Sequence, residues 1–154
     1  KQNFSNQVKV FEHQLELAIN YDMPVVLHIR KAFEELFKYS ADLKKLPAVI
    51  FHSFSGTNDQ AEFFLNRGVN AFFSFGTPLL NGHRKAEKTL REISIERVLV
   101  ETDAPYQPVS GEKFSFASDI LKVVQKAAAL KDVQFNEMVE TVNGNLQKTL
   151  TKRL

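Results

Sequence analysis

The sequence predicts an α/β fold built on parallel strands, because short apolar segments recur along it and a helical pattern fills each gap. The segments begin at Val25, Ala48, Ala71 and Val98, so successive starts lie 23, 23 and 27 residues apart. This spacing is typical of repeated βα units, in which a helix carries the chain back to the start of the next parallel strand. We therefore expect strands near residues 25–29, 48–54, 71–75 and 98–103.

Helices are predicted between the strands and at both ends of the chain. Residues 5–21 repeat apolar side chains at a spacing of three or four, and Ser5 is suited to cap this helix. The clearest helix covers 57–66, since Thr57 and Gln60 form a capping-box pattern and Gly68 suits a left-handed residue after the helix. Further helices are expected at 32–43, 84–93, 115–130 and 136–142, with a last helical turn from residue 145.

The composition fits one globular domain over residues 1–154, because 44% hydrophobic residues supply one ordinary core. The absence of cysteine excludes a disulfide framework and a thiolate metal site. The net charge of +2 is too small to indicate nucleic-acid binding by itself. No stretch approaches the roughly 20 apolar residues of a membrane span, and no signal-peptide pattern is present, so we expect a cytoplasmic protein. Because the sequence opens with Lys1, we expect it to be processed or cut from a longer chain.

The segment 98–106 carries the acidic residues around which the candidate functional site is organised. It is a buried strand pattern that runs into two carboxylates, Glu101 and Asp103, before Pro105 ends it. Period-two alternation places both carboxylates on the face of Leu99, at the carboxyl end of the strand. A carboxylate there is unfavourable unless a cation or several donors meet it. Asp103 is therefore either a metal ligand or a firmly hydrogen-bonded structural acid.

Two earlier strands each end in a histidine, His28 and His52. One such histidine by itself would be interpreted as a core residue hydrogen-bonded to backbone. Two of them, followed by a strand that ends in Asp103, favour a catalytic divalent metal site at one end of a parallel sheet. Glu101, one pleat deeper, is expected to orient a ligand rather than to bind the metal.

Polar residues after these histidines are candidates for contact with an anionic substrate. Arg30 follows His28, while Ser53 and Ser55 form a small loop that could present hydroxyl and N–H groups to a phosphate. Ordinary turn chemistry explains the serines equally well. From the residues alone, the sheet is either an open doubly wound sheet or part of a (β/α)8 barrel, a fold that needs about 250 residues.

Three motifs carry a family resemblance: VVLHIRKA at 25–32, VIFHSFSG at 49–56 and VLVETDAPY at 98–106. In this order and spacing they closely resemble the TatD family of metal-dependent deoxyribonucleases, within the amidohydrolase-type barrels. The resemblance implies a distorted TIM barrel that holds one or two divalent cations (Mg, Mn or Zn) and hydrolyses phosphodiester bonds in DNA. It further implies that His28 and His52 contact metal or phosphate, and that Asp103 binds metal and takes the proton of the attacking water.

The family's His-x-His strand and its metal-bridging Glu have no counterpart in residues 1–154. We therefore expect a partial (β/α)8 barrel, about its C-terminal half, which completes its metal site with ligands from an N-terminal segment. A second interpretation keeps the barrel and the metal but changes the substrate to a small ester, amide or phosphoester. A third is a catalytically incomplete scaffold that associates through the exposed edges of an unclosed sheet.

Overall fold

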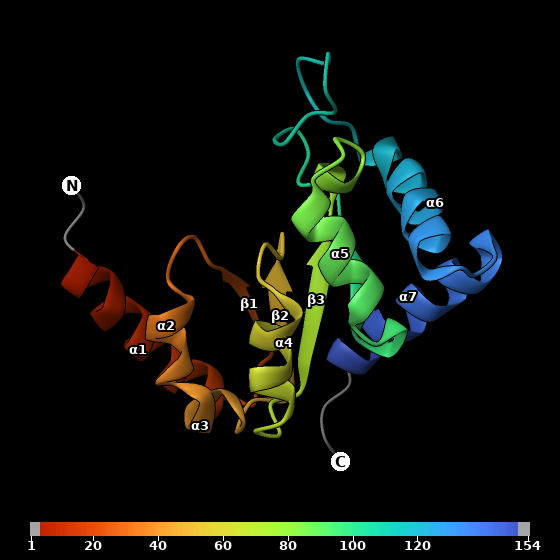
Figure 1. Cartoon of the computed structure of the whole chain (residues 1–154). Coiled ribbons are helices and arrows are strands. Elements are labelled where there is room, and N and C mark those ends of the chain that lie inside the picture. The colour runs from red at the N-terminus through yellow and green to blue at the C-terminus, as the bar shows by residue number, and fades with distance from the viewer. Residues whose placement is uncertain (1–3, 151–154) are drawn as a thin grey trace.

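A single parallel sheet forms the centre of the computed structural model, which describes residues 4–150 (Figure 1). Its strands lie in the order β1-β2-β3-β4, which is also their order along the chain. All neighbouring pairs are parallel, so the four carboxyl ends lie along the same edge of the sheet. The strands are β1 (Val25–His28), β2 (Val49–His52), β3 (Ala71–Phe75) and β4 (Val98–Val100).

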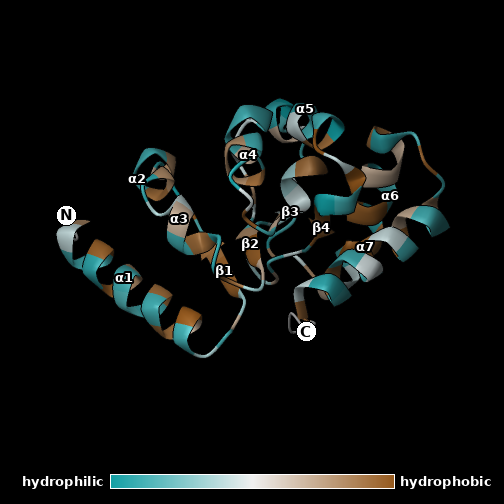
Figure 2. Ribbon diagram, turned by 90° about the horizontal axis from the view of Figure 1, so that it is seen from below, coloured by the Kyte–Doolittle hydropathy of each residue, from teal (hydrophilic) through white to brown (hydrophobic). Residues whose placement is uncertain are grey.

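Seven α-helices are found in residues 4–150, and Figure 2 shows them in an arc around the strands. Their bounds are α1 (Phe4–Asn20), α2 (Phe33–Phe37), α3 (Ser40–Leu43), α4 (Asn58–Leu65), α5 (Arg84–Glu92), α6 (Ile120–Lys131) and α7 (Phe135–Leu150). Short 3-10 turns lie at η1 (Thr77–Leu79), η2 (Ile95–Arg97) and η3 (Ala117–Asp119). This alternation confirms the predicted βα repeat.

The main core lies between the sheet and the arc of helices. Phe51 of β2 stacks on Phe73 of β3 with ring centroids 5.1 Å apart, and Phe64 of α4 packs on Phe51 at 4.9 Å. All three rings are buried. Rings at these separations are in the favourable range for aromatic pairs. The cluster therefore fixes β2 and β3 against α4 and sets the positions of their carboxyl ends.

The opposite face of the sheet carries the alternate side chains of each strand. A small second cluster there contains Ala48, Phe72 and Leu99, with Ile50 packed against it. Toward the β1 edge this face opens to solvent, because the side chain of Val26 is 67% exposed. His28 and His52 occupy the same face as Val26 and Ile50, two residues further along their strands.

The strands end earlier than the sequence pattern predicts at three of the four positions. β1 ends at His28 rather than near residue 29, β2 spans 49–52 rather than 48–54, and β4 spans 98–100 rather than 98–103. The left-handed φ of Ser53 (46°) and of Asp103 (57°) turns the backbone out of the sheet. Ser53, Glu101 and Asp103 therefore lie on the loops that leave the strands, whereas His28 and His52 are the last residues of β1 and β2.

Three predicted helices also differ from the structure. The helix expected at 32–43 is divided into α2 and α3, and Tyr39 at the break packs edge-on against Phe11 of α1 and donates to Glu12. The helix expected at 115–130 begins later, at η3, where Asp119 accepts a hydrogen bond from the Phe116 N–H. The helix expected at 136–142 and the turn from 145 are one continuous α7, since the packing of buried Asn145 overrides the low helix propensity of Gly144.

The helix at 57–66 is confirmed as α4. Thr57 accepts from the Gln60 N–H and the Gln60 side chain accepts from the Thr57 N–H, which is the expected capping box. Gly68 has a φ of 78°, the left-handed conformation expected after the helix. Among the described residues, no helix has both the length and the apolar character that a transmembrane segment needs.

Candidate metal centre

His28 and His52 lie side by side at the carboxyl ends of β1 and β2. They are register partners in the parallel pair, and their ring centroids are 5.4 Å apart. Equal positions on neighbouring parallel strands place side chains on one face of the sheet. The structure therefore brings the two histidines together, as their matching strand contexts predict.

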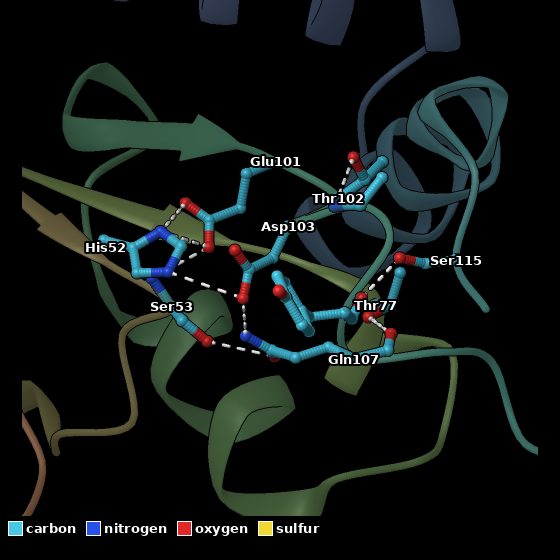
Figure 3. Close-up of polar contacts among 10 residues, drawn as sticks. His52, Ser53, Thr77, Glu101, Thr102, Asp103, Gln107 and Ser115 are labelled. Atoms are coloured by element: carbon cyan, nitrogen blue, oxygen red, sulfur yellow. Dashed lines mark hydrogen bonds and ion pairs between the residues drawn. The ribbon is translucent and has the colours of Figure 1, made fainter.

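Glu101 holds His52 from the end of β4. Its carboxylate lies 2.9 Å from Nδ1 of His52 and accepts a second hydrogen bond, also 2.9 Å, from the Ser53 N–H (Figure 3). Gly76 leaves room for this side chain, since a Cβ there would lie 3.3 Å from Cγ of Glu101. Two hydrogen bonds to a carboxylate that is 17% exposed fix the imidazole ring in one orientation.

Asp103 faces the other nitrogen of the same imidazole. Its Oδ2 lies 3.7 Å from Nε2 of His52, and Figure 3 shows the ring between the two carboxylates. Nδ1 of His52 thus faces Glu101 and Nε2 faces Asp103. In the tautomer that carries its proton on Nδ1, the Nε2 lone pair and Oδ2 of Asp103 are two facing acceptors, the kind of pair that a divalent cation would take as ligands.

Gln107 and Ser53 complete this polar group. The Gln107 amide N–H donates to Oδ2 of Asp103 at 2.6 Å, and the Gln107 amide oxygen accepts from the Ser53 hydroxyl at 3.2 Å (Figure 3). The sequence patterns did not single out Gln107, because it lies in a loop without periodicity or a motif of its own. The loop after β4 brings Gln107 to Asp103, four residues earlier, and only the folded arrangement of the β2 and β4 ends brings it to Ser53.

The other predicted contacts lie apart from this group. Arg30 is exposed in the loop after β1, and Ser55 is exposed in the loop after β2. No hydrogen bond between Ser55 and His52, Glu101 or Asp103 is present in the described part of the chain. Ser55 instead lines a separate cleft of about 500 Å³, together with the charged residues Lys31, Lys85, Glu34 and Glu35.

The donor set fits part of the coordination shell of a divalent cation. Imidazole nitrogen and carboxylate oxygen are ordinary ligands of Zn²⁺ and Mn²⁺, and the carboxylate of Glu101 behind His52 is a common arrangement in metal sites. A catalytic zinc site takes three protein ligands. Within residues 4–150, no three histidine, aspartate or glutamate side chains are grouped closely enough to hold a metal ion by themselves.

Comparisons of sequence and of fold with known proteins match this chain to the same family. The sequence profile of the family described as TatD related DNase matches residues 1–151. The chain is 28% identical over 148 residues to the uncharacterized metal-dependent hydrolase YabD of Bacillus subtilis, covering 92% of this chain and 56% of YabD. It is 35% identical over 112 residues to the 3'-5' ssDNA/RNA exonuclease TatD of Escherichia fergusonii, covering 68% of this chain and 42% of that protein.

Comparison of the fold with solved structures also matches the chain to a TatD homolog. The crystal structure of YJJV, a TatD homolog from Escherichia coli, superposes with a TM-score of 0.86 at 25% identity and covers 95% of this chain and 57% of that one. The chain thus spans about half the length of the bacterial relatives it matches. On the match of residues 1–151, the chain belongs to the TatD related DNase family.

Proposed function

We propose that this chain carries part of the active site of a divalent-metal-dependent hydrolase that cleaves phosphodiester bonds in DNA. The observation that carries the proposal is the pairing of Nε2 of His52 with Oδ2 of Asp103 at 3.7 Å, at the carboxyl edge of a parallel sheet. That edge is where enzymes with parallel (β/α) sheets hold their catalytic groups. Both residues present acceptor atoms to the same space, which is what a cation requires.

Each residue has a stated role in this proposal. His52 and Asp103 hold the cation, and His28, whose ring lies 5.4 Å from that of His52, contacts the cation or a phosphate oxygen. Glu101 keeps Nδ1 of His52 protonated and its ring in place. A bound divalent cation would neutralise charge on the phosphate and lower the pKa of the attacking water. An oxygen of Asp103 accepts the proton that this water releases.

The choice of a nucleic-acid substrate is supported by two observations. Relatives include the 3'-5' ssDNA/RNA exonuclease TatD and the human 3'-5' RNA nuclease TATDN2, which is 34% identical over 136 residues, or 82% of this chain and 18% of TATDN2. Lys31 and Lys85 line the cleft that contains Ser55, and although Glu34 and Glu35 line it too, no ion pair of either lysine is found among the described residues. We propose that these lysines, with Arg30, Ser53 and Ser55, contact the phosphates of the strand.

We also propose that residues 1–154 form a single domain that is the C-terminal part of a barrel. Among the described residues β1 and β4 are the edge strands of the sheet and no further strand pairs with them, and the face that carries His28 is open at Val26. A segment outside these residues would then close the sheet and add the remaining metal ligands. This accounts for a site in which two donors pair closely and, within residues 4–150, no group of three completes the shell.

Hydrolysis assays with matched variants test the proposed function. Because the proposed site takes further ligands from a segment outside residues 1–154, the assays use the full-length protein, which is incubated with single-stranded DNA, with RNA of the same sequence or with a small phosphodiester, in the presence of manganese, magnesium or a chelator. We expect cleavage of DNA only with metal, and a loss of roughly 100-fold or more in Asp103→Asn, since general-base catalysis is worth at least this much. Asp132→Asn is the control, because Asp132 has the same left-handed φ (56°) but lies at the end of α6.

Three results would overturn the proposal. Cleavage that persists after bound metal has been removed, with removal verified by elemental analysis, would exclude a metal-dependent reaction. Faster turnover of the small phosphodiester than of either polymer would show that the substrate is not a nucleic acid. Cleavage of RNA without cleavage of DNA would overturn the choice of DNA as substrate.

A further inference from the structure

We propose that Gln107 is a positioning residue for Asp103, an inference that rests on the proposed metal site. The Gln107 amide donates to Oδ2 of Asp103 at 2.6 Å, and Oδ2 is the oxygen that faces Nε2 of His52. A carboxylate on a loop rotates about its χ angles unless a partner holds it. The hydrogen bond from Gln107 restricts that rotation and keeps the carboxylate turned toward His52.

The backbone of Gln107 is itself fixed to the end of β3. The buried Thr77 hydroxyl donates to the Gln107 carbonyl, and Gln107 has a left-handed φ of 53°. Asn81, beyond η1, donates to the carbonyl of Pro108 at 3.1 Å and accepts from the Ser110 N–H at 2.7 Å. These bonds attach the loop after β4 to the segment after β3, so Gln107 projects from a fixed base.

The side chain of Gln107 joins two strand ends. While its N–H binds Asp103 after β4, its amide oxygen accepts from the Ser53 hydroxyl after β2 at 3.2 Å. A primary amide can donate to a carboxylate and accept from a hydroxyl at the same time, whereas Leu can do neither and ionised Glu cannot donate. The residue type therefore matches both partners, and Glu at this position would repel Asp103.

The experiment measures manganese binding by titration calorimetry together with kcat and KM on single-stranded DNA. We expect Gln107→Leu and Gln107→Met, neither of which can donate to Asp103, to weaken manganese binding and to lower kcat by roughly 10-fold to 100-fold, the usual effect of removing a partner that orients a metal ligand. KM for DNA should stay within about two-fold, because a positioning residue does not touch the substrate. Gln125→Leu, at an exposed position on α6, is the matched control.

Ser53→Ala gives a second test, read through the manganese Kd alone, since it removes the hydroxyl that holds the far end of the Gln107 amide while its KM for DNA also reports the proposed phosphate contact of Ser53. We expect a change in the same direction and smaller than that of Gln107→Leu. An unchanged manganese Kd in all three variants would overturn the inference, and so would a raised KM with an unchanged kcat, which would make Gln107 a substrate contact. Asp103→Asn separates the two proposals: if it too leaves manganese binding unchanged, the proposed metal site has failed rather than the role of Gln107.

Discussion

Replacing Glu101 by Gln tests whether this carboxylate sets the orientation of His52. The two hydrogen bonds that Glu101 accepts, from Nδ1 of His52 and from the Ser53 N–H, are 2.9 Å each. A carboxylate has two accepting oxygens, whereas an amide has one, so Gln can satisfy only one of these donors well. A hydrogen bond to a charged group contributes about 1.5 to 3 kcal/mol, so the substitution should lower the free energy of unfolding by about 2 kcal/mol.

The same change should weaken metal binding. A loss of about 2 kcal/mol in the preference for one orientation of His52 corresponds to about 30-fold in an equilibrium constant. This lies within the roughly 10-fold to 100-fold effect measured for residues that orient metal-binding histidines. Urea unfolding gives the change in stability and manganese titration gives the change in Kd, with the exposed Glu140→Gln as the control. If Glu101→Gln binds manganese like the wild type while Asp103→Asn does not, Glu101 does not orient a metal ligand.

Three further predictions concern the fold that holds the site. Phe64→Ala should lower the free energy of unfolding by about 4 kcal/mol in urea, because its ring is buried in the main core, whereas the half-exposed Phe114→Ala should change it by less than about 0.5 kcal/mol. Asn145→Leu should cost about 2 kcal/mol in the same assay, since the backbone carbonyls of Ile95 in η2 and of Val98 in β4 lose their donor. The hydrogen bond to Glu12, together with burial, raises the pKa of Tyr39 to about 12 from 10.0, so this stabilisation is complete below pH 10.0 and is lost as the pH rises through about 12. A spectrophotometric titration should lose this late tyrosinate step in Tyr39→Phe, and an unchanged titration would contradict the assignment.

Local chemistry accounts for the features that were predicted correctly. The start of α4 follows from Thr57 and Gln60, which bond to each other within one turn. The positions of the strands follow from apolar runs at regular spacing, and the placement of His28 and His52 together follows from their equal positions on parallel strands. The boundaries that were wrong lie where distant contacts decide, as at Asn145, whose side chain binds β4 backbone from within α7.

The sequence by itself determined the βα repeat, the capped helix and the three strand ends that carry His28, His52 and Asp103, because each depends on residues that are neighbours in the chain. Only the tertiary structure decided which atoms meet: Nδ1 of His52 with Glu101, Nε2 with Asp103, and Gln107 between Asp103 and Ser53. Except for the Gln107–Asp103 pair, these contacts join residues that are 48 to 54 positions apart in the chain. They depend on strand register and on left-handed loop residues. No local pattern encodes such distances, since they arise from the packing of the whole sheet against its helices.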